Sequence, residues 1–276
     1  MSNQLTLPAR RAFVRAPGVI AHYPCFQAAA EGAVMIDRSG AGNNAAFGAQ
    51  LLASNAWATP GRLTLADNTA GTQAGAPFLA AGVLALNLAT ESFVVSGMYA
   101  ATATASRPVV AFGEISGAAN AANGFILRSE VTSGVARLAA CTGAAGGLSY
   151  ATASAVAISG PGVGDKHVAM AYDAPNRKLW LIVDGVLDAT ANSGVGWDVA
   201  AAVAAMGAAN GGTAFGNLVF GGAPRVNPAQ QQVWACSLYG WQVAKRVGGL
   251  PANLDALARR LARHPLQVLT ASEWPA

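Results

Sequence analysis

The chain of 276 residues is rich in hydrophobic residues, at 53%, and poor in charged ones, at 11%, with a formal net charge of +4 at pH 7. A chain of this length buries about 75% of its unfolded surface, so its stability does not depend on disulfides or metal ions. Its basic residues are scattered, and the sequence lacks the dense basic stripe with interleaved aromatic residues that is typical of nucleic-acid binding. We therefore expect no nucleic-acid partner.

Small residues dominate the apolar content, with 32 glycines beside many alanines. A GC-rich genome and surfaces buried against other subunits would both produce this composition, and both explanations remain open. Residues 199–209 form an alanine-rich stretch that falls short of the roughly 18 residues needed to span a membrane. Residues 1–18 lack the apolar core of a signal peptide, and the cysteines Cys25, Cys141 and Cys236 form no CxxC pair. The sequence therefore predicts reduced, buried cysteines in a protein that folds in a cytoplasm.

The predicted elements begin with a polar arm over residues 1–18, followed from residue 19 by short strands. Alternation over 93–98 and 167–172 predicts strands with two different faces, and apolar runs at 108–112 and 124–128 predict two more. The continuous apolar run at 179–183 is typical of a strand covered on both sides. Within it we expect one face to carry Trp180 and Ile182, and the other to carry Leu179, Leu181 and Val183.

Turn formers separate these runs, and Asp184-Gly185 favours a type I′ hairpin turn because both residues tolerate positive φ. Many short strands with frequent turns predict an all-β sandwich over residues 19–250. Residues 251–276 differ, since Leu254, Leu257 and Leu261 share one helical stripe that opens after Asn253 and stops before a proline. We expect one amphipathic helix that closes the domain, then a short tail. The basic end of the helix is either a solvated surface or a face for a partner.

Three stretches together resemble the laminin-G-like and concanavalin A-like superfamily. They are AHYP at 21–24 followed by DRSGAGNNA at 37–45; KHVAMAYD at 166–173 followed by LWLIVDGV at 179–186; and LVFGG at 218–222 followed by the strand at 233–239 and the helix from Asn253. Lys166 and Ile182 depart from the family's hairpin pattern, which has a histidine and an aromatic residue there. The resemblance covers residues 19–262. It implies an all-β, two-sheet antiparallel jelly-roll sandwich with one C-terminal helix.

Some members of this superfamily are glucanases, which place their carboxylates at alternate positions of one strand so that all face the sugar. This sequence has no such cluster, since Glu91, Glu114 and Glu130 are isolated from one another. It also lacks a GxSxG motif, a phosphate-binding glycine loop and a paired-histidine metal motif. We therefore expect no enzymatic activity.

Three further kinds of site have candidate residues in this sequence. Many family members hold calcium at the sandwich rim, and Asp37 and Asn43 could supply oxygen ligands here, although Asp37 could equally cap its own turn; no other cofactor is expected. Glycan binding would need exposed aromatic residues, for which Trp57 and Trp197 are the candidates in loop-like contexts, while a core position is the alternative for each. Assembly contacts are expected from Trp274 in the tail and from the arm residues Arg10, Arg11 and Arg15.

The resemblance extends to stand-alone domains of tailed bacteriophages, and ARHPLQVL at 262–269 is similar to the endings of such proteins. It implies a non-enzymatic virion structural protein, either a head decoration or a tail or fibre component. Such a protein would fold in the host cytoplasm, reside in the virion, form homo-oligomers and contact other virion proteins. The alternative is a glycan-binding module that recognises a host surface polysaccharide.

Overall fold

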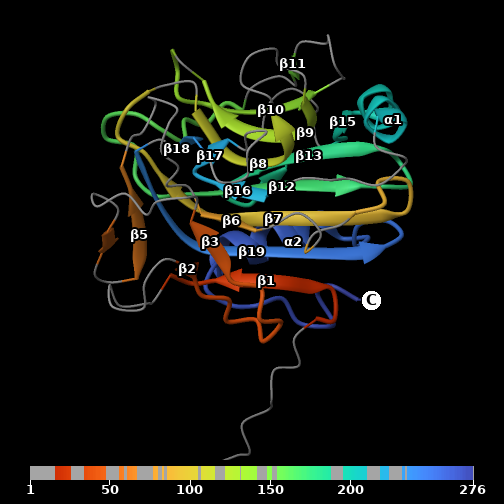
Figure 1. The fold of residues 1–276 in the computed structure, drawn as a ribbon, viewed down its shortest axis with the longest axis horizontal. Helices are drawn as coiled ribbons and strands as arrows, with labels where there is room; N and C mark the ends of the chain where they lie inside the picture. Colours follow the sequence, from red (N-terminus) through yellow and green to blue (C-terminus); the bar gives the residue numbers. More distant parts are fainter. Residues whose placement is uncertain are drawn as a thin grey trace, which may run out of the picture.

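The computed structural model describes residues 16–25, 34–47, 56–58, 61–66, 77–79, 83, 86–104, 107–115, 122–130, 132–141, 148–150, 154–187, 195–209, 218–223, 232–233 and 235–275. Within these residues the chain forms two large antiparallel sheets, one two-stranded ribbon and two helices (Figure 1). The prediction of an all-β, two-sheet antiparallel sandwich is confirmed.

The first sheet, here called the large sheet, has nine strands in the described residues. Its order is β14 (Val186–Leu187), β13 (Lys178–Val183), β12 (Lys166–Asp173), β7 (Glu91–Ala100), β19 (Cys236–Val247), β5 (Arg62–Leu65) and β4 (Ala56–Ala58), with β1 (Val19–Tyr23) paired to β19 and β15 (Trp197–Asp198) paired to β13. Strands distant in sequence are therefore neighbours at its centre, where β7 lies between β12 and β19.

The second sheet has eight strands in the same described part of the chain. Its order is β11 (Leu148–Tyr150), β10 (Ala136–Cys141), β9 (Ala122–Ser129), β8 (Arg107–Ile115), β16 (Leu218–Phe220), β6 (Pro77–Leu79), β3 (Ala45–Phe47) and β2 (Val34–Met35). The ribbon consists of β17 (Gly222–Ala223) and β18 (Gln232–Val233).

Alternation along the strands divides the buried residues into two cores, as expected for a pleated sheet. The main core lies between the two sheets, where Phe93 and Tyr172 of the large sheet pack against Phe125 of the second, with ring centroids 5.5–6.1 Å apart. The predicted facing of the 179–183 strand is confirmed. Leu179, Leu181 and Val183 enter this main core, whereas Trp180 and Ile182 face the outer side of the large sheet.

Two glycines occupy positions with special requirements, one for space and one for backbone conformation. Gly97 of β7 lies against the indole of Trp241, and a Cβ there would be 2.3 Å from a ring atom, so only glycine fits. Gly185 and Asp184 both have positive φ, at 80° and 50°, as the predicted hairpin turn requires.

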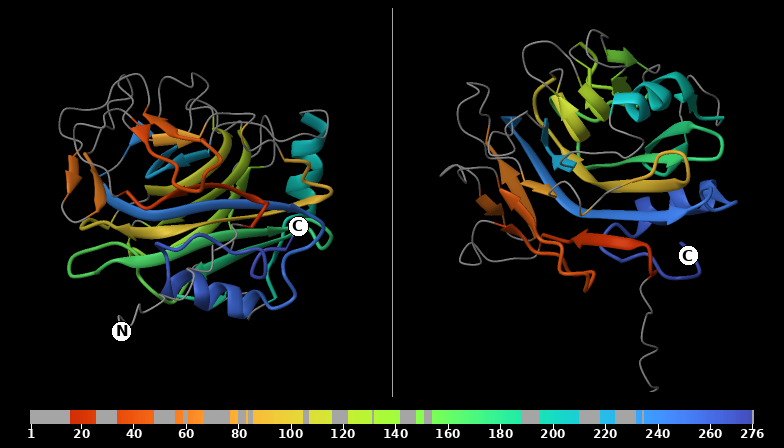
Figure 2. Two further views of the ribbon diagram at one scale, coloured as in Figure 1. Left: turned by 90° about the horizontal axis from the view of Figure 1, so that it is seen from below. Right: turned by 45° about the vertical axis from the view of Figure 1, so that its right-hand side comes forward.

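The outer face of the large sheet is covered by α2 (Leu254–Arg263), which lies on the side away from the second sheet (Figure 2). Its buried residues Leu257, Ala258 and Leu261 pack on small side chains of β7 and β12. Asn253 caps the helix by accepting a hydrogen bond from the Ala256 N–H at 2.9 Å, which confirms the predicted start.

The predicted C-terminal helix is confirmed, and the structure adds a second helix that the sequence analysis did not predict, α1 (Ala200–Ala209). This segment is nearly all alanine and has no apolar stripe, so periodicity gives no signal, while alanine's high helix propensity does favour it. None of the described helices is long and apolar enough to cross a membrane. Cys25 is a free, buried thiol and Cys236 is buried, and the prediction placed both in the interior. The side chain of Cys141 lies outside the described residues.

Candidate functional site

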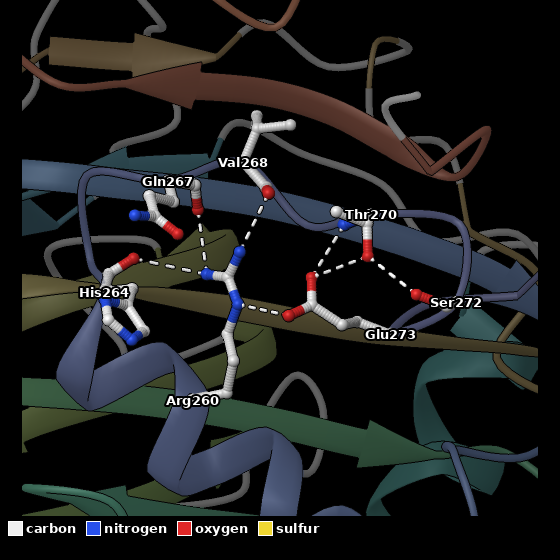
Figure 3. A network of polar contacts seen from close by, with 7 residues as sticks. All are labelled: Arg260, His264, Gln267, Val268, Thr270, Ser272 and Glu273. Carbon is white, nitrogen blue, oxygen red and sulfur yellow. Dashed lines mark hydrogen bonds and ion pairs between the residues drawn. The ribbon is translucent and has the colours of Figure 1, made fainter. Parts of the chain in front are cut away.

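The C-terminal segment, residues 264–275, folds back along the outer face of the large sheet and is held there by Arg260 of α2 (Figure 3). The Arg260 Nε donates to Glu273 Oε1 at 2.6 Å. The two Nη atoms donate to three backbone carbonyls, those of His264 at 3.2 Å, Gln267 at 2.9 Å and Val268 at 2.9 Å. One guanidinium therefore closes the turn after the helix and anchors the segment that follows it.

Glu273 links Arg260 to the C-terminal segment, because its two carboxylate oxygens accept hydrogen bonds from different residues. Its Oε2 accepts hydrogen bonds from the Thr270 N–H at 2.8 Å and the Thr270 hydroxyl at 3.0 Å. Burial alone would raise the pKa of Glu273, but the hydrogen bonds and charge of Arg260 and the bonds from Thr270 lower it below its ordinary value. The carboxylate is thus charged and paired at neutral pH.

The position of Trp274 contradicts the expectation that this residue makes assembly contacts. Its side chain is fully buried and its indole N–H donates to the Lys245 carbonyl at 3.1 Å, next to Gly18. Ala16 is buried beside it and donates its N–H to the Leu269 carbonyl at 2.9 Å. Trp274 therefore anchors the C-terminal segment to its own domain and is not accessible to a neighbouring subunit. The other expected assembly residues, Arg10, Arg11 and Arg15, lie outside the described residues.

A hollow of about 420 Å³, here called the Trp180 hollow, opens beside the start of α2. It is lined by Asp173, Asn176, Trp180, Leu187, Leu250, Pro251, Ala252, Asn253, Leu254 and Asp255. It combines one half-buried indole with two carboxylates and two carboxamides, because the β12–β13 turn and the segment before α2 meet here. The Gly196 backbone lies against the indole, where a Cβ would be 2.7 Å from Cε2. The Trp180 Nε1 is buried and has no hydrogen-bond acceptor within the described chain.

The polar groups of the Trp180 hollow are held in place by hydrogen bonds. Asp173 Oδ1 accepts from the Leu250 N–H at 3.1 Å, and Oδ2 accepts from Asn176 Nδ2 at 2.6 Å. Asp255 pairs with Arg259 at 3.1 Å, and both side chains are more than half exposed. Because a carboxylate has about four lone-pair sites, both aspartates keep capacity for further donors.

A second hollow of about 660 Å³, here called the Arg246 hollow, lies on the other side of α2's first turn, against the C-terminal segment. It is lined by Arg246, Leu250, Pro251, Ala252, Asn253, Ala256, Leu257, Arg260, Ser272, Glu273 and Pro275. Arg260 and Glu273 neutralise each other there at 2.6 Å. The Nε of Arg246 is buried without an acceptor, and no ion pair of Arg246 occurs among the described residues.

A row of buried polar side chains crosses the outer face of the large sheet. His22, Gln242 and Ser96 are cross-strand neighbours on β1, β19 and β7, and His167 lies on the next strand, β12. All four are at most 4% exposed, and each has at least one polar atom that no described group satisfies. Burial lowers the pKa of His167 to about 4, against a smaller opposing effect of the Asp184 charge, so this imidazole is neutral at pH 7.

Asp37 and Asn43, the residues expected to bind calcium, lie in a turn that is held by hydrogen bonds to the Asp37 carboxylate. The Asp37 carboxylate accepts hydrogen bonds from the His22 N–H, the Ser39 N–H and hydroxyl, and the Asn43 N–H, at 2.7–3.0 Å. Burial would raise the pKa of Asp37, but these bonds outweigh it and lower the pKa. The Asn43 carbonyl accepts from the Tyr23 hydroxyl at 2.6 Å. This geometry fits the capping alternative, and no cluster of three metal-binding side chains occurs among the described residues.

Trp57 and Trp197, the tryptophans expected to bind glycan, do not form one site. Trp57 lies on β4 at one end of the large sheet, whereas Trp197 pairs with β13 near the other end. Both are half-buried and pack against the main core, Trp57 edge-on to Phe47 at 6.1 Å. The structure instead brings Trp180 together with polar groups. The sequence places Trp180 on the face of its strand opposite to Leu179, Leu181 and Val183, and the structure shows that this is the outer face.

The fold is similar to that of Trypanosoma rangeli sialidase. In its complex with 2,3-difluorosialic acid the TM-score is 0.54 at 14% identity, covering 92% of this chain and 34% of the sialidase chain; for a mutant displaying trans-sialidase activity the values are 0.53, 13%, 90% and 33%. The present chain thus spans about a third of the length of those sialidase chains. At such identities the likeness shows the fold alone.

A heptameric SAP-like pentraxin from Limulus polyphemus aligns over 73% of this chain and 81% of its own, with 14% identity and a TM-score of 0.43. No family model matches the chain, and no curated protein matches it. The architecture defines the class of protein: a mostly β, two-sheet antiparallel sandwich.

Proposed function

We propose that this protein is a non-catalytic glycan-binding module whose sugar site is the Trp180 hollow. The observation that carries the proposal is the grouping of an indole with the carboxylates of Asp173 and Asp255 and the carboxamides of Asn176 and Asn253 in one hollow of about 420 Å³. A sugar ring has apolar C–H faces that pack on an aromatic ring, and its hydroxyls both donate and accept hydrogen bonds. The volume is within the range typical of small-ligand sites.

Binding suits these groups better than catalysis. Both oxygens of Asp173 already hold the surrounding loops through Leu250 and Asn176, and Asp255 is paired with Arg259. The half-buried indole of Trp180 instead offers its exposed apolar surface to the C–H face of a sugar. A rigid, hydrogen-bonded rim of this kind orients a ligand without ordering cost.

The test is an oligosaccharide array probed with the full chain and with Trp180→Leu, which keeps apolar packing on the outer face of the large sheet. Trp57→Leu is the matched control, because Trp57 is also half-buried but lies at the other end of the large sheet. We expect Trp180→Leu to lose binding by tenfold or more, about 1.4 kcal/mol, and Trp57→Leu to keep it. Equal binding by both variants would refute the site.

The virion role expected from the resemblance remains a second reading, and nothing observed in the fold selects it. The C-terminal tail was expected to contact neighbouring subunits, but Arg260 and Trp274 bond this segment to its own domain. Light scattering on the full chain and on a form lacking residues 1–15 tests the remaining support. An oligomer that becomes a monomer on deletion would favour assembly through the arm, and two monomers would oppose it.

A further inference from the structure

The two hollows beside α2 are neighbours. Leu250, Pro251, Ala252 and Asn253 line both, so this short segment is the boundary between them. A ligand that rests on Trp180 therefore reaches the Arg246 hollow by extending across four residues of chain.

The charges of the two hollows differ in sign. Around the Trp180 hollow the charged groups are the carboxylates of Asp173 and Asp255, the latter offset by Arg259. Around the Arg246 hollow, Arg260 and Glu273 cancel, and Arg246 contributes a positive charge that forms no ion pair with any described side chain. Any ligand that spans both is thereby oriented, with its negative end at Arg246.

Arg246 is also under-satisfied as a hydrogen-bond donor. Its side chain lies on the outer face of β19 with Nε buried, and no described group accepts from that atom. A guanidinium fork matches a carboxylate or sulfate through two parallel hydrogen bonds. Leu250, Pro251, Ala256 and Pro275 supply apolar walls for the rest of a sugar unit.

We propose that the Arg246 hollow binds the anionic group, a carboxylate or a sulfate, of an acidic glycan whose adjoining unit occupies the Trp180 hollow. This inference rests on the proposed function and names its ligand class. Arg246 is then the residue that selects acidic over neutral glycans.

The experiment compares binding to arrayed neutral, uronate-containing and sulfated oligosaccharides by the full chain, Arg246→Met, Arg246→Lys and the control Arg263→Met. Arg263 is exposed on the last turn of α2 and does not line the Arg246 hollow, so its substitution removes the same charge elsewhere. We expect Arg246→Met to weaken acidic glycans by about ten- to a hundredfold, as for lost charged hydrogen bonds, and to leave neutral ones unchanged. Arg246→Lys should recover part of the loss, and Arg263→Met should change affinity less than twofold. The uronate and sulfate arms separate the two anionic groups.

Two outcomes overturn the inference by different routes. If neutral glycans bind through Trp180 while Arg246→Met affects neither class, or affects both alike, the acidic site is refuted and the glycan function stands. If no glycan of any class binds the full chain, both fail together. The Nε–H resonance of Arg246 in the unsubstituted protein gives a check that needs no variant: it should shift when uronate oligosaccharides are added and stay in place with neutral ones.

Discussion

Replacing Arg260 by methionine should detach the C-terminal segment from the large sheet. The change removes an ion pair at 2.6 Å and three hydrogen bonds to backbone carbonyls, from a side chain that is 15% exposed. Removing one partner of a buried pair costs about 3–5 kcal/mol. Because Glu273 is 28% exposed and water can solvate it after the change, we expect the low end, about 3 kcal/mol.

Urea unfolding measures this loss, and hydrogen exchange over residues 264–275 shows whether it is local. We expect faster exchange in the segment, including the Trp274 N–H that bonds to Thr270, with less change in β7 and β12. Arg263→Met is the control and should stay within about 0.5 kcal/mol, as is usual for an exposed surface residue. If Arg260→Met and Arg263→Met behave alike in both assays, the bonds of Arg260 do not hold the C-terminal segment on the sheet.

Three further predictions concern the sheet itself. Gly97→Ala places a Cβ 2.3 Å from the Trp241 ring and should lower the free energy of unfolding by about 1–3 kcal/mol, as overpacking does; an unchanged melting temperature would contradict this packing. Gln242→Met removes a buried amide that has no partner in the described part of the chain and should raise stability by about 1 kcal/mol in urea unfolding, whereas a loss would show that the amide is bonded by buried water. The pKa of His167 is about 4 in the folded protein and 6.5 ordinarily, so the unfolded chain binds the proton at a higher pH than the folded one. The contribution of His167 to the free energy of unfolding should therefore be constant above pH 7, fall by roughly 3 kcal/mol between pH 6.5 and 4, and level off below pH 4. Urea unfolding from pH 7.5 to 4, repeated with His167→Asn, checks this, and an equal fall in both proteins would assign the effect elsewhere.

Much of the fold could be predicted because the strands alternate cleanly. Leu179 and Trp180 face opposite cores as period-two alternation requires, and Asp184-Gly185 forms the turn that two positive φ values demand. The helix after Asn253 was visible because its leucines share one stripe. By contrast α1 was not, since a run of alanines has no periodicity to detect.

The candidate site could not be predicted in the same way, because it is made of segments that meet only in three dimensions. Trp180 comes from β13, whereas Asn253 and Asp255 follow about seventy residues later, and the sequence contains no motif that joins them. The basic cluster at the end of α2 was recognised, but the partners of Arg260 lie in a tail that returns to the helix. Trp57 and Trp197 were chosen for their loop-like contexts, and the structure packs both against the main core.

The most direct measurement is an NMR titration of the tryptophan indole N–H resonances with a glycan that binds on the array. We predict that the Trp180 resonance shifts with saturation, because the ligand packs against the indole that lines the hollow. The Trp241 and Trp274 resonances should stay in place, since their N–H groups are bonded to the Met98 and Lys245 carbonyls. A binding glycan that shifts other indole resonances and leaves that of Trp180 unmoved would place the sugar site elsewhere and contradict the proposed function.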